Sequence, residues 1–341
     1  MSLKKYCKVA IYYPYDRDVD GMTDEIENGI RVYRSKYKLE NKLRNRFNMF
    51  RAMKKIKRNF KPDIIHAQVA TEAGRFAVAL GKAFGIPVII TEHSTVEASG
   101  VKKFPHHMYA DFAYRYSVYN ICVSEYLRDE LKKIFPQYAF HTIYNGISIP
   151  ENINKLPEYR VEGYTNMILV AALYDWEIKG IPSLLEIIKK LKDEECRVKL
   201  HIVGDGEFLE KFQDLANRLE IQDDCIFYGR FSKNEVYSIL QQMDFLVSAS
   251  KFESFGCSIA EAMMMGKPVV ATKSGGPESI ITEETGILVE NGDIQALHDG
   301  ILKMMNNYWR YDSEKIKRYA RERFDIDLVS QKYVITYEKE I

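Results

Sequence analysis

The residues best suited to chemistry are two glutamates in the second half of the chain, Glu253 and Glu261. Glu253 lies in a predicted loop after an apolar strand that ends at Ser248, and a helix is predicted to begin near Ser258. The first N–H groups of a helix have no partner within it and attract anions, and Gly256 lets the backbone approach such a ligand closely. The segment therefore predicts an anion site with a carboxylate beside it.

The two glutamates differ in how well a structural role explains them. Glu261 follows Ser258 by three residues, and Ser-x-x-Glu before an apolar helix is the pattern of a capping box. A capping role and a binding role for Glu261 both stay open on this pattern. Glu253 has no such structural explanation. Because a carboxylate repels phosphate and accepts hydrogen bonds well, we expect Glu253 to face hydroxyl groups.

Alternating strands and helices must position these glutamates. Short apolar runs without polar alternation are typical of parallel strands that are covered on both faces, and helical patterns separate most of them. In the first half, strands are predicted at 9–13, 30–34, 64–67, 88–91, 121–124 and 142–144, and helices at 39–59, 71–84, 104–119 and 125–134. In the second half, strands are predicted at 167–173, 198–203, 225–228, 245–248, 269–272 and 287–289, and helices at 181–192, 207–219, 233–242, 258–265, 294–307, 313–324 and 326–340.

The stretch 145–166 is rich in Asn-Gly, proline and glycine and reads as a loop between two domains. We predict one domain at 1–150, a second at 151–325, and a C-terminal helix at 326–341 that returns to the first domain. The predicted fold class is α/β, with two doubly wound, Rossmann-like domains that face each other across a cleft. Ligands of such sheets bind at the carboxyl ends of the strands.

Composition excludes several classes of protein. A chain of 341 residues with 46% hydrophobic and 28% charged residues has the proportions of a globular protein, which excludes a disordered one. It contains no apolar run long enough for a membrane span and no signal peptide. Its five cysteines form no Cys-x-x-Cys pair, which favours reduced thiols in the cytoplasm over disulfides or a zinc site.

One segment is strongly basic although the net charge of the whole chain is only +1. Residues 31–61 hold 13 Lys and Arg against one acid, a formal charge of +12 that leaves −11 for the rest. Apolar residues spaced by three and four predict an amphipathic helix over 39–60. Its basic face is either an ordinary solvated face or one that attracts phosphates. Because no nucleic-acid motif accompanies it, an anionic membrane surface is the favoured partner, at the inner face.

The segment 252–280 resembles the retaining family-4 glycosyltransferases of the GT-B fold, group 1 type. The resemblance rests on Glu-x7-Glu within Glu-Ser-Phe-Gly … Glu-Ala-Met … Gly-Lys-Pro-Val-Val-Ala … Gly-Gly. Residues 200–206, Leu-His-Ile-Val-Gly-Asp-Gly, and 227–231, Phe-Tyr-Gly-Arg-Phe, are similar to further segments of that family. The first half contains further similar segments, namely Pro-Asp-Ile-Ile-His-Ala at 62–67, Thr-Glu-His at 91–93, Val-Ser-Glu at 123–125 and Asn-Gly at 145–146. The resemblance therefore covers nearly the whole chain.

The resemblance implies a site for a nucleotide-diphosphate sugar in the second domain. It gives catalytic roles to Glu253, which would contact the donor sugar, to Lys179, which would bind the diphosphate, and to His93, which would face the donor sugar. A cation at the leaving phosphate stabilises the charge that develops there. The further donor-binding residues implied are Ser254, Phe255, Gly256, Cys257, Glu261, Gly204 and Phe231. Among them Glu261 would hold the ribose hydroxyls and the backbone of Phe231 would touch the base.

The chain departs from the family pattern in two places. The family has Gly-Arg before the lysine, whereas residues 171–179 read Ala-Ala-Leu-Tyr-Asp-Trp-Glu-Ile-Lys, which is longer and lacks arginine. One phosphate-binding cation is therefore missing or supplied from elsewhere. At the start, strand 9–13 leads through an acidic loop to strand 30–34, and no helix fits between them. We expect the N-terminal domain to lack the first strand, loop and helix of the family.

The acidic loop raises an alternative chemistry. Asp16, Asp18, Asp20 and Glu27 occupy positions 1, 3, 5 and 12 of a calcium-loop pattern that has glycine at position 6. Against calcium, a strand precedes the loop and Thr23 stands at position 8, where an apolar residue is needed. A plain acidic surface loop is the other reading of this segment.

These observations lead to one functional expectation and two alternatives. We expect a retaining, metal-independent hexosyltransferase that uses a nucleotide-diphosphate sugar as co-substrate and no other cofactor. It would act on an acceptor hydroxyl in polysaccharide or glycolipid biosynthesis, in the cytoplasm or peripherally on the inner membrane face. Nothing singles out an enzymic nucleophile, and the resemblance implies a front-face mechanism. The alternatives are a catalytically silent nucleotide-binding GT-B module and a sugar-nucleotide epimerase.

Overall fold

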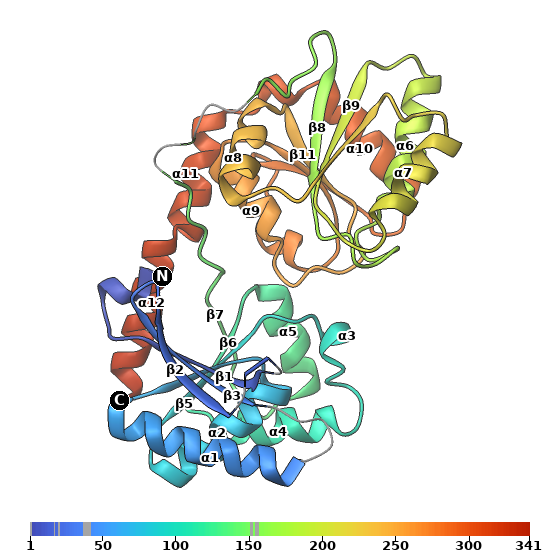
Figure 1. Cartoon of the computed structure of the whole chain (residues 1–341). Coiled ribbons are helices and arrows are strands. Elements are labelled where there is room, and N and C mark those ends of the chain that lie inside the picture. The colour runs from blue at the N-terminus through green and yellow to red at the C-terminus, as the bar shows by residue number, and fades with distance from the viewer. Residues whose placement is uncertain (1, 17, 20, 37–41, 151–152, 154–156) are drawn as a thin grey trace. The chain divides into compact units, whose positions relative to one another are not determined.

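The computed structural model describes residues 2–16, 18–19, 21–36, 42–150, 153 and 157–341. The chain divides into two compact units. The first comprises Met1–Val123, Leu127–Ile143 and Val329–Ile341, and the second comprises Ser124–Tyr126 and Tyr144–Leu328. Each unit combines strands with helices that pack on them (Figure 1).

A six-stranded parallel sheet forms the centre of the second unit, with the strand order β10-β9-β8-β11-β12-β13. Its strands are β8 (Thr165–Val170), β9 (Val198–Val203), β10 (Cys225–Gly229), β11 (Phe245–Ser248), β12 (Val269–Thr272) and β13 (Gly286–Val289). The chain adds β9 and β10 on one side of β8 and then returns to add β11 on the other. Ligands of such sheets bind outside the carboxyl ends of the strands at which the order reverses, here β8 and β11.

Helices cover both faces of this sheet (Figure 1). They are α6 (Ile181–Asp193), α7 (Leu209–Arg218), α8 (Lys233–Gln242), α9 (Cys257–Met264), α10 (Ile294–Met305) and α11 (Ser313–Phe324). One face carries α6, α7 and α10, whose apolar stripes form a single core with the sheet. Leu184, Leu185 and Ile188 of α6 are completely buried there, as the helical spacing of these residues predicts.

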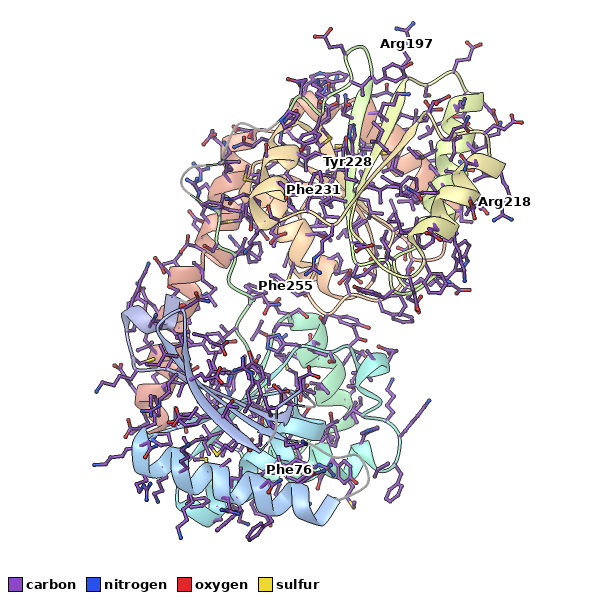
Figure 2. The ribbon with its side chains drawn as sticks, viewed as in Figure 1. Phe76, Arg197, Arg218, Tyr228, Phe231 and Phe255 are labelled. Atoms are coloured by element: carbon purple, nitrogen blue, oxygen red, sulfur yellow. The ribbon has the colours of Figure 1, made fainter. Side chains whose placement is uncertain are left out.

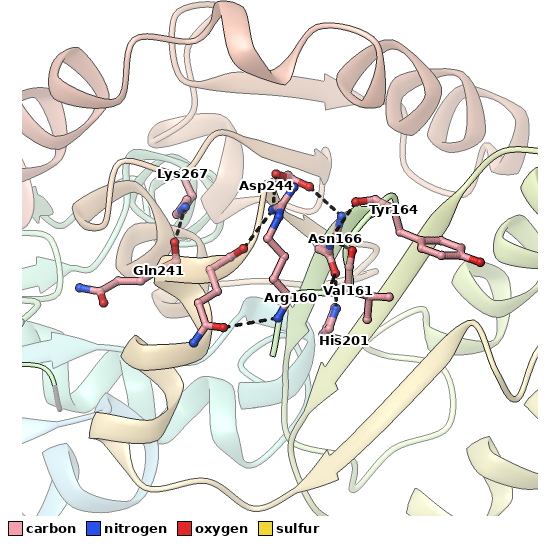
Figure 3. A network of polar contacts seen from close by, with 9 residues as sticks. Arg160, Val161, Tyr164, Asn166, His201, Gln241, Asp244 and Lys267 are labelled. Carbon is pink, nitrogen blue, oxygen red and sulfur yellow. Dashed lines mark hydrogen bonds and ion pairs between the residues drawn. The ribbon is translucent and has the colours of Figure 1, made fainter. Parts of the chain in front are cut away.

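A polar network holds the segment before β8 against the sheet (Figure 3). The Asp244 carboxylate accepts a hydrogen bond from Nη1 of Arg160 at 2.7 Å and one from the backbone N–H of Asn166 at 2.8 Å. The Asn166 side chain exchanges hydrogen bonds with the backbone of Val161, and its Oδ1 lies 3.0 Å from Nε2 of His201. Because a buried polar group without a partner is costly, this network fixes the point at which β8 enters the sheet.

The first unit contains two sheets. A parallel sheet of order β4-β5-β6-β7 is formed by β4 (Ile65–Gln68), β5 (Val88–Glu92), β6 (Tyr119–Cys122) and β7 (His141–Thr142). A three-stranded sheet of order β1-β3-β2 is formed by β1 (Ala10–Asp16), β2 (Met22–Glu27) and β3 (Ile30–Lys36), with β2 antiparallel to β3. No strand pairing joins the two sheets within the part of the chain that the structure describes.

The helices of the first unit are α1 (Lys42–Asn59), α2 (Arg75–Phe84), α3 (Val96–Ser99), α4 (His106–Tyr116), and most of α5 (Glu125–Ile134) and α12 (Ile326–Glu340). Helix α1 buries Met53 and Ile56 against Tyr33 of β3. Helix α12 returns Tyr337 to the four-stranded sheet, where its hydroxyl lies 2.7 Å from Nδ1 of His66. The other ring nitrogen of His66 lies 2.7 Å from Oγ1 of Thr91, so both nitrogens are occupied.

The predicted α/β class with two Rossmann-like domains is confirmed, and most elements lie within a few residues of their predicted positions. The strand predicted at 121–124 is displaced, because β6 is Tyr119–Cys122. Helix α3 was not predicted. Of the predicted helix 39–59, residues 39–41 lie outside the described residues. The hypothesis that the family's first strand and helix are missing stays a prediction.

The acidic segment after β1 also differs from its prediction, because its second half forms β2 (Met22–Glu27) instead of a loop. Acidic residues are unfavourable in strands, but here arginines of β3 compensate them. Asp24 lies 2.7 Å from Arg31, which lowers the pKa of the Asp24 carboxyl, and Glu27 pairs with Arg34. Half of the predicted calcium loop is therefore a strand, and Asp20 lies outside the described residues. Among the described residues, no group of three or more His, Cys, Asp or Glu side chains could hold a metal ion.

We predict that Asp244→Ala destabilises the protein by about 1–3 kcal/mol, because it removes the acceptor of a buried backbone N–H group. Urea denaturation followed by circular dichroism measures the loss. The matched control is Asp193→Ala, whose carboxylate is 58% exposed and pairs with Lys189 on the surface of α6. This control should change stability by less than about 0.5 kcal/mol. Equal losses in the two variants would contradict the role of the network.

We also predict that acid destabilises the fold from pH 6.5 downward. Burial lowers the pKa of His201 to about 4, and burial together with nearby His93 lowers the pKa of His66 to about 4. As the pH falls, the histidines therefore take up protons in the unfolded chain before they do so in the folded one. The free energy of unfolding is highest above pH 6.5 and decreases toward pH 4, by about 1.4 kcal/mol per histidine and pH unit. His201→Gln should flatten the pH dependence of the unfolding free energy between pH 6.5 and 5. An unchanged slope would refute the assignment.

Candidate functional site

Lys179 lies in the turn between β8 and α6, at the carboxyl end of β8. The next residue, Gly180, is the N-cap of α6 and has a φ of 63°. A Cβ atom on Gly180 would lie 2.0 Å from the carbonyl oxygen of Ala249, so only glycine permits this approach. The backbone N–H of Lys251 also donates to the carbonyl of Ile178 at 2.8 Å. The turn that carries Lys179 is thus held against the segment after β11.

Glu253 lies in that segment, between β11 and α9. Its backbone N–H donates to the carbonyl of Ser274 at 2.9 Å, and its own carbonyl accepts from the N–H of Gly276 at 2.7 Å. A Cβ atom on Gly276 would lie 2.4 Å from Cα of Phe255, so a side chain there would push the two loops apart. The loop after β12 therefore fixes the backbone of Glu253.

The side chains of Lys179 and Glu253 meet at the strands where the order of the sheet reverses. Nζ of Lys179 lies 2.5 Å from Oε1 of Glu253. Ser250, which is buried, donates its hydroxyl to the same carboxylate oxygen at 3.0 Å. The pairing of β8 with β11 brings together two predicted catalytic residues that are 74 positions apart in the sequence.

Helix α9 begins directly after this loop, at Cys257. Its N-cap is Gly256, which has a φ of 95°, and no side chain caps the helix. The capping role, one of the two that the sequence left open for Glu261, is not realised, because Ser258 lies inside the helix. The first N–H groups of α9 are left with the partial positive charge of a helix N-terminus, which favours an anionic ligand. Ser254 and Phe255 complete the loop, with the Phe255 ring buried.

Glu261 is half-buried on α9, and burial raises the pKa of its carboxyl. Its Oε1 accepts a hydrogen bond from the hydroxyl of Tyr237 at 3.2 Å. The ring of Tyr237 is fully buried in α8, and its hydroxyl also lies 3.1 Å from the carbonyl oxygen of Ser148. Sequence reasoning missed Tyr237, because a tyrosine on a helical stripe is indistinguishable from other core residues until its partner is known.

Gly204 and Phe231 lie at the carboxyl ends of β9 and β10. Gly204 has a φ of 153°, and a Cβ atom on it would lie 1.7 Å from the carbonyl oxygen of Ala171, so the turn after β9 lies directly against the turn after β8. Phe231 is half-buried and packs its ring 5.2 Å from that of Tyr228 (Figure 2). The second unit thus gathers all predicted site residues except His93.

His93 belongs to the first unit, directly after β5. Its Nε2 lies 2.5 Å from Oε1 of Gln68, the last residue of β4, and burial lowers the pKa of the imidazole. The ring is therefore neutral at pH 7 and oriented by Gln68. A common site for His93 and the residues of the second unit stays a prediction. Gln68 was not singled out in the sequence, because a lone glutamine after a strand carries no motif.

The longer turn that replaces the family's Gly-Arg is ordered by its own contacts. Oδ1 of Asp175 accepts from the backbone N–H groups of Glu177 and Ile178 at 2.8 and 2.7 Å. Trp176 stacks on Phe212 of α7 with 4.9 Å between the ring centroids. The extra residues thus form a packed turn in which no arginine stands near Lys179 in the sequence.

Comparison with known proteins identifies the family. Residues 154–323 match the model described as "Glycosyl transferases group 1", and residues 3–150 match "Glycosyltransferase Family 4". The chain belongs to the family-4, group 1 glycosyltransferases. It is therefore a retaining glycosyltransferase of GT-B fold that transfers a sugar from a nucleotide sugar.

Individual relatives support this assignment at modest identity. An uncharacterized glycosyltransferase of Methanocaldococcus jannaschii is 28% identical over 338 residues, which cover 90% of each chain. The alpha-monoglucosyldiacylglycerol synthase of Streptococcus pneumoniae is 29% identical over 63% of this chain and 53% of its own length. In fold, HepE of Anabaena, solved in complex with UDP, has a TM-score of 0.76 at 20% identity, over 91% of this chain and 87% of HepE.

Proposed function

We propose that this glycosyltransferase moves a hexose, with retention at the anomeric carbon, from a nucleoside-diphosphate sugar to an acceptor hydroxyl in polysaccharide or glycolipid biosynthesis. The observation that carries the proposal is the meeting of Lys179 and Glu253 beside the uncapped N-terminus of α9. A cation and a helix N-terminus together suit a diphosphate, and a carboxylate beside them suits the hydroxyls of the attached sugar.

Each residue of this site has a proposed role. Lys179 and the first N–H groups of α9, with the backbone of Ser254 to Cys257, bind the diphosphate. Glu253 accepts hydrogen bonds from the donor sugar, and Glu261, oriented by Tyr237, accepts those of the ribose. The turn at Gly204 and the backbone of Phe231 bind the nucleoside, and His93 of the first unit faces the donor sugar.

The proposed reaction needs no covalent enzyme intermediate. The bond between the anomeric carbon and the phosphate oxygen breaks while the acceptor oxygen bonds to the same face of that carbon, and the acceptor proton passes to the departing phosphate. Negative charge develops on the phosphate, where Lys179 and the N-terminus of α9 stabilise it. Removal of one such group typically lowers the rate by about a hundredfold or more.

We predict that one nucleoside diphosphate stabilises the protein in a thermal-shift panel of UDP, GDP, ADP and CMP. Ligand at a hundredfold excess over its Kd stabilises the native state by about 2.7 kcal/mol, a readily measured shift. Glu261→Ala should abolish the shift because the ribose loses its acceptor. EDTA should leave the shift unchanged, since the proposed contacts involve no metal ion.

The Asp193→Ala variant, altered on the surface of α6, is the control and should retain the full shift. If none of the nucleotides stabilises the wild-type protein, the proposed donor site is wrong. Binding without transfer or donor hydrolysis would instead favour the silent nucleotide-binding module.

We further propose that α1 holds the enzyme at an anionic membrane surface, on the inner face. Phe47 is 60% and Phe50 is 46% exposed on this helix. A surface cavity of about 1130 Å³ lies along it and is lined by these two rings together with Arg51, Lys54, Lys55, Lys57 and Arg58, among others. Aromatic rings that enter the lipid interface beside cations that face phosphate headgroups are the features of interfacial helices. No helix among the described residues has the length and apolarity that crossing a bilayer requires.

We predict that the protein cosediments with phosphatidylcholine vesicles only when they contain phosphatidylglycerol. Because each basic residue near such a surface contributes about 1 kcal/mol, replacing Arg51 and Lys54 by glutamate should weaken binding at least tenfold. Trp309→Ser combined with Arg310→Glu alters an aromatic and a basic residue on the second unit, where Trp309 is 64% exposed, and should bind like wild type. Equal binding of wild type and the α1 variant would rule out α1 as the contact.

A further inference from the structure

The Lys179 ammonium is bound to a carboxylate in this structure, in the place where a diphosphate would need it. Oε1 of Glu253 accepts from both Lys179 Nζ, at 2.5 Å, and Ser250 Oγ, at 3.0 Å. The two charged side chains are only 25% and 19% exposed, so water screens their attraction weakly. Both of these hydrogen bonds go to the same carboxylate oxygen.

The carboxylate is the fixed member of this pair. Ser250 is 2% exposed, its carbonyl accepts from Oγ1 of Thr272 at 2.6 Å, and its hydroxyl orients Glu253. The backbone of Glu253 is bonded on both sides to the loop after β12. The ammonium of Lys179, in contrast, stands at the end of a long, flexible side chain on a turn. We therefore expect the ammonium to move and the carboxylate to stay when the pair separates.

The fixed carboxylate has opposite effects on a nucleotide sugar and on a free nucleoside diphosphate. A nucleotide sugar draws Lys179 to its phosphates and supplies hydroxyl donors that replace the ammonium at Glu253. A free nucleoside diphosphate also draws Lys179 away but supplies no donor. It leaves Glu253 as a largely buried carboxylate that keeps the Ser250 hydrogen bond but has no cation beside it and a second anion nearby, which is unfavourable.

We propose that Glu253, oriented by Ser250, competes with free nucleoside diphosphate for Lys179, so that the site selects the intact sugar donor and releases the product. This inference rests on the proposed donor site and adds a selectivity that the transfer reaction itself does not require. Ser250 is the positioning residue of this device. Once the sugar has left, the salt bridge re-forms and displaces the diphosphate.

The test is a titration calorimetry comparison of UDP with UDP-glucose on wild type, Glu253→Gln, Lys179→Met and the double variant. Glutamine keeps the shape of the side chain but removes the charge that holds Lys179. We expect Glu253→Gln to bind UDP at least fivefold more tightly than wild type does. Its affinity for UDP-glucose should rise little, because the glutamine binds the sugar hydroxyls less well than the carboxylate does. In the Lys179→Met background the gain for UDP should disappear, because the residue competed for is absent.

A second readout isolates Ser250, which leaves both charges in place. Ser250→Ala should lower the inhibition constant of UDP in the transfer reaction at least twofold while the KM for UDP-glucose stays within twofold of wild type. Ser250→Thr keeps the hydroxyl and should restore the wild-type inhibition constant. A merely structural role would change both constants together.

The outcomes separate this inference from the proposed function. If wild type and variants bind UDP and Glu253→Gln binds it no more tightly, or if the gain persists without Lys179, the competition is refuted and the donor site stands. If neither UDP nor UDP-glucose binds any of the proteins, both this inference and the site for a uridine nucleotide are refuted.

Discussion

The parallel pairing of β8 with β11 is the constraint on which the candidate site depends. It brings the carboxyl ends of two strands to the same edge of the sheet, and each end leads into a segment that carries one charged residue of the pair. The segments can touch only because Gly180 has no side chain, since a Cβ atom there would lie 2.0 Å from the carbonyl of Ala249. Backbone packing thus brings together the two segments that carry Lys179 and Glu253.

The site combines two kinds of electrostatic environment within a few residues. The uncapped N-terminus of α9 and Lys179 favour an anion, whereas Glu253 and Glu261 favour hydroxyl donors. Burial raises the pKa of the Glu261 carboxyl, and the Tyr237 hydroxyl donates a hydrogen bond to it. A ligand that carries phosphates between two sets of hydroxyl groups satisfies both environments. A nucleoside-diphosphate sugar has this order of groups, which agrees with the family to which the chain belongs.

The first unit also has a parallel sheet with helices, and it carries two further features, His93 and the exposed face of α1. Its parallel sheet orients His93 through Gln68, and α12 returns to this sheet through Tyr337 and the buried His66. Helix α1 packs one stripe inward and turns Phe47 with several cations outward. Exposed aromatic rings are unfavourable in water, and an anionic lipid interface would accept the rings while its phosphates attract the neighbouring cations.

The sequence by itself determined most of the elements and pointed to the family. Helices α8 and α11 begin and end as predicted, because Ser232 and Asp312 cap them locally and apolar spacing marks their inward faces. Glu253, Glu261 and Lys179 could be singled out as candidates because their motif lies within a short stretch or beside a glycine. Local signals suffice for such features, since they depend on neighbours in the chain.

Only the tertiary structure decided which side chains meet. The acidic sequence of β2 predicted a loop, because the arginines that neutralise its carboxylates lie on another strand, β3. The capping box at Ser258 failed because Gly256, in a left-handed conformation, starts α9 one residue earlier. Ser250 carries no motif, and its effect on Glu253 arises from a hydroxyl that the fold buries against one carboxylate oxygen. Partners distant in sequence are set by strand order and close backbone packing, which a single sequence does not encode in any local pattern.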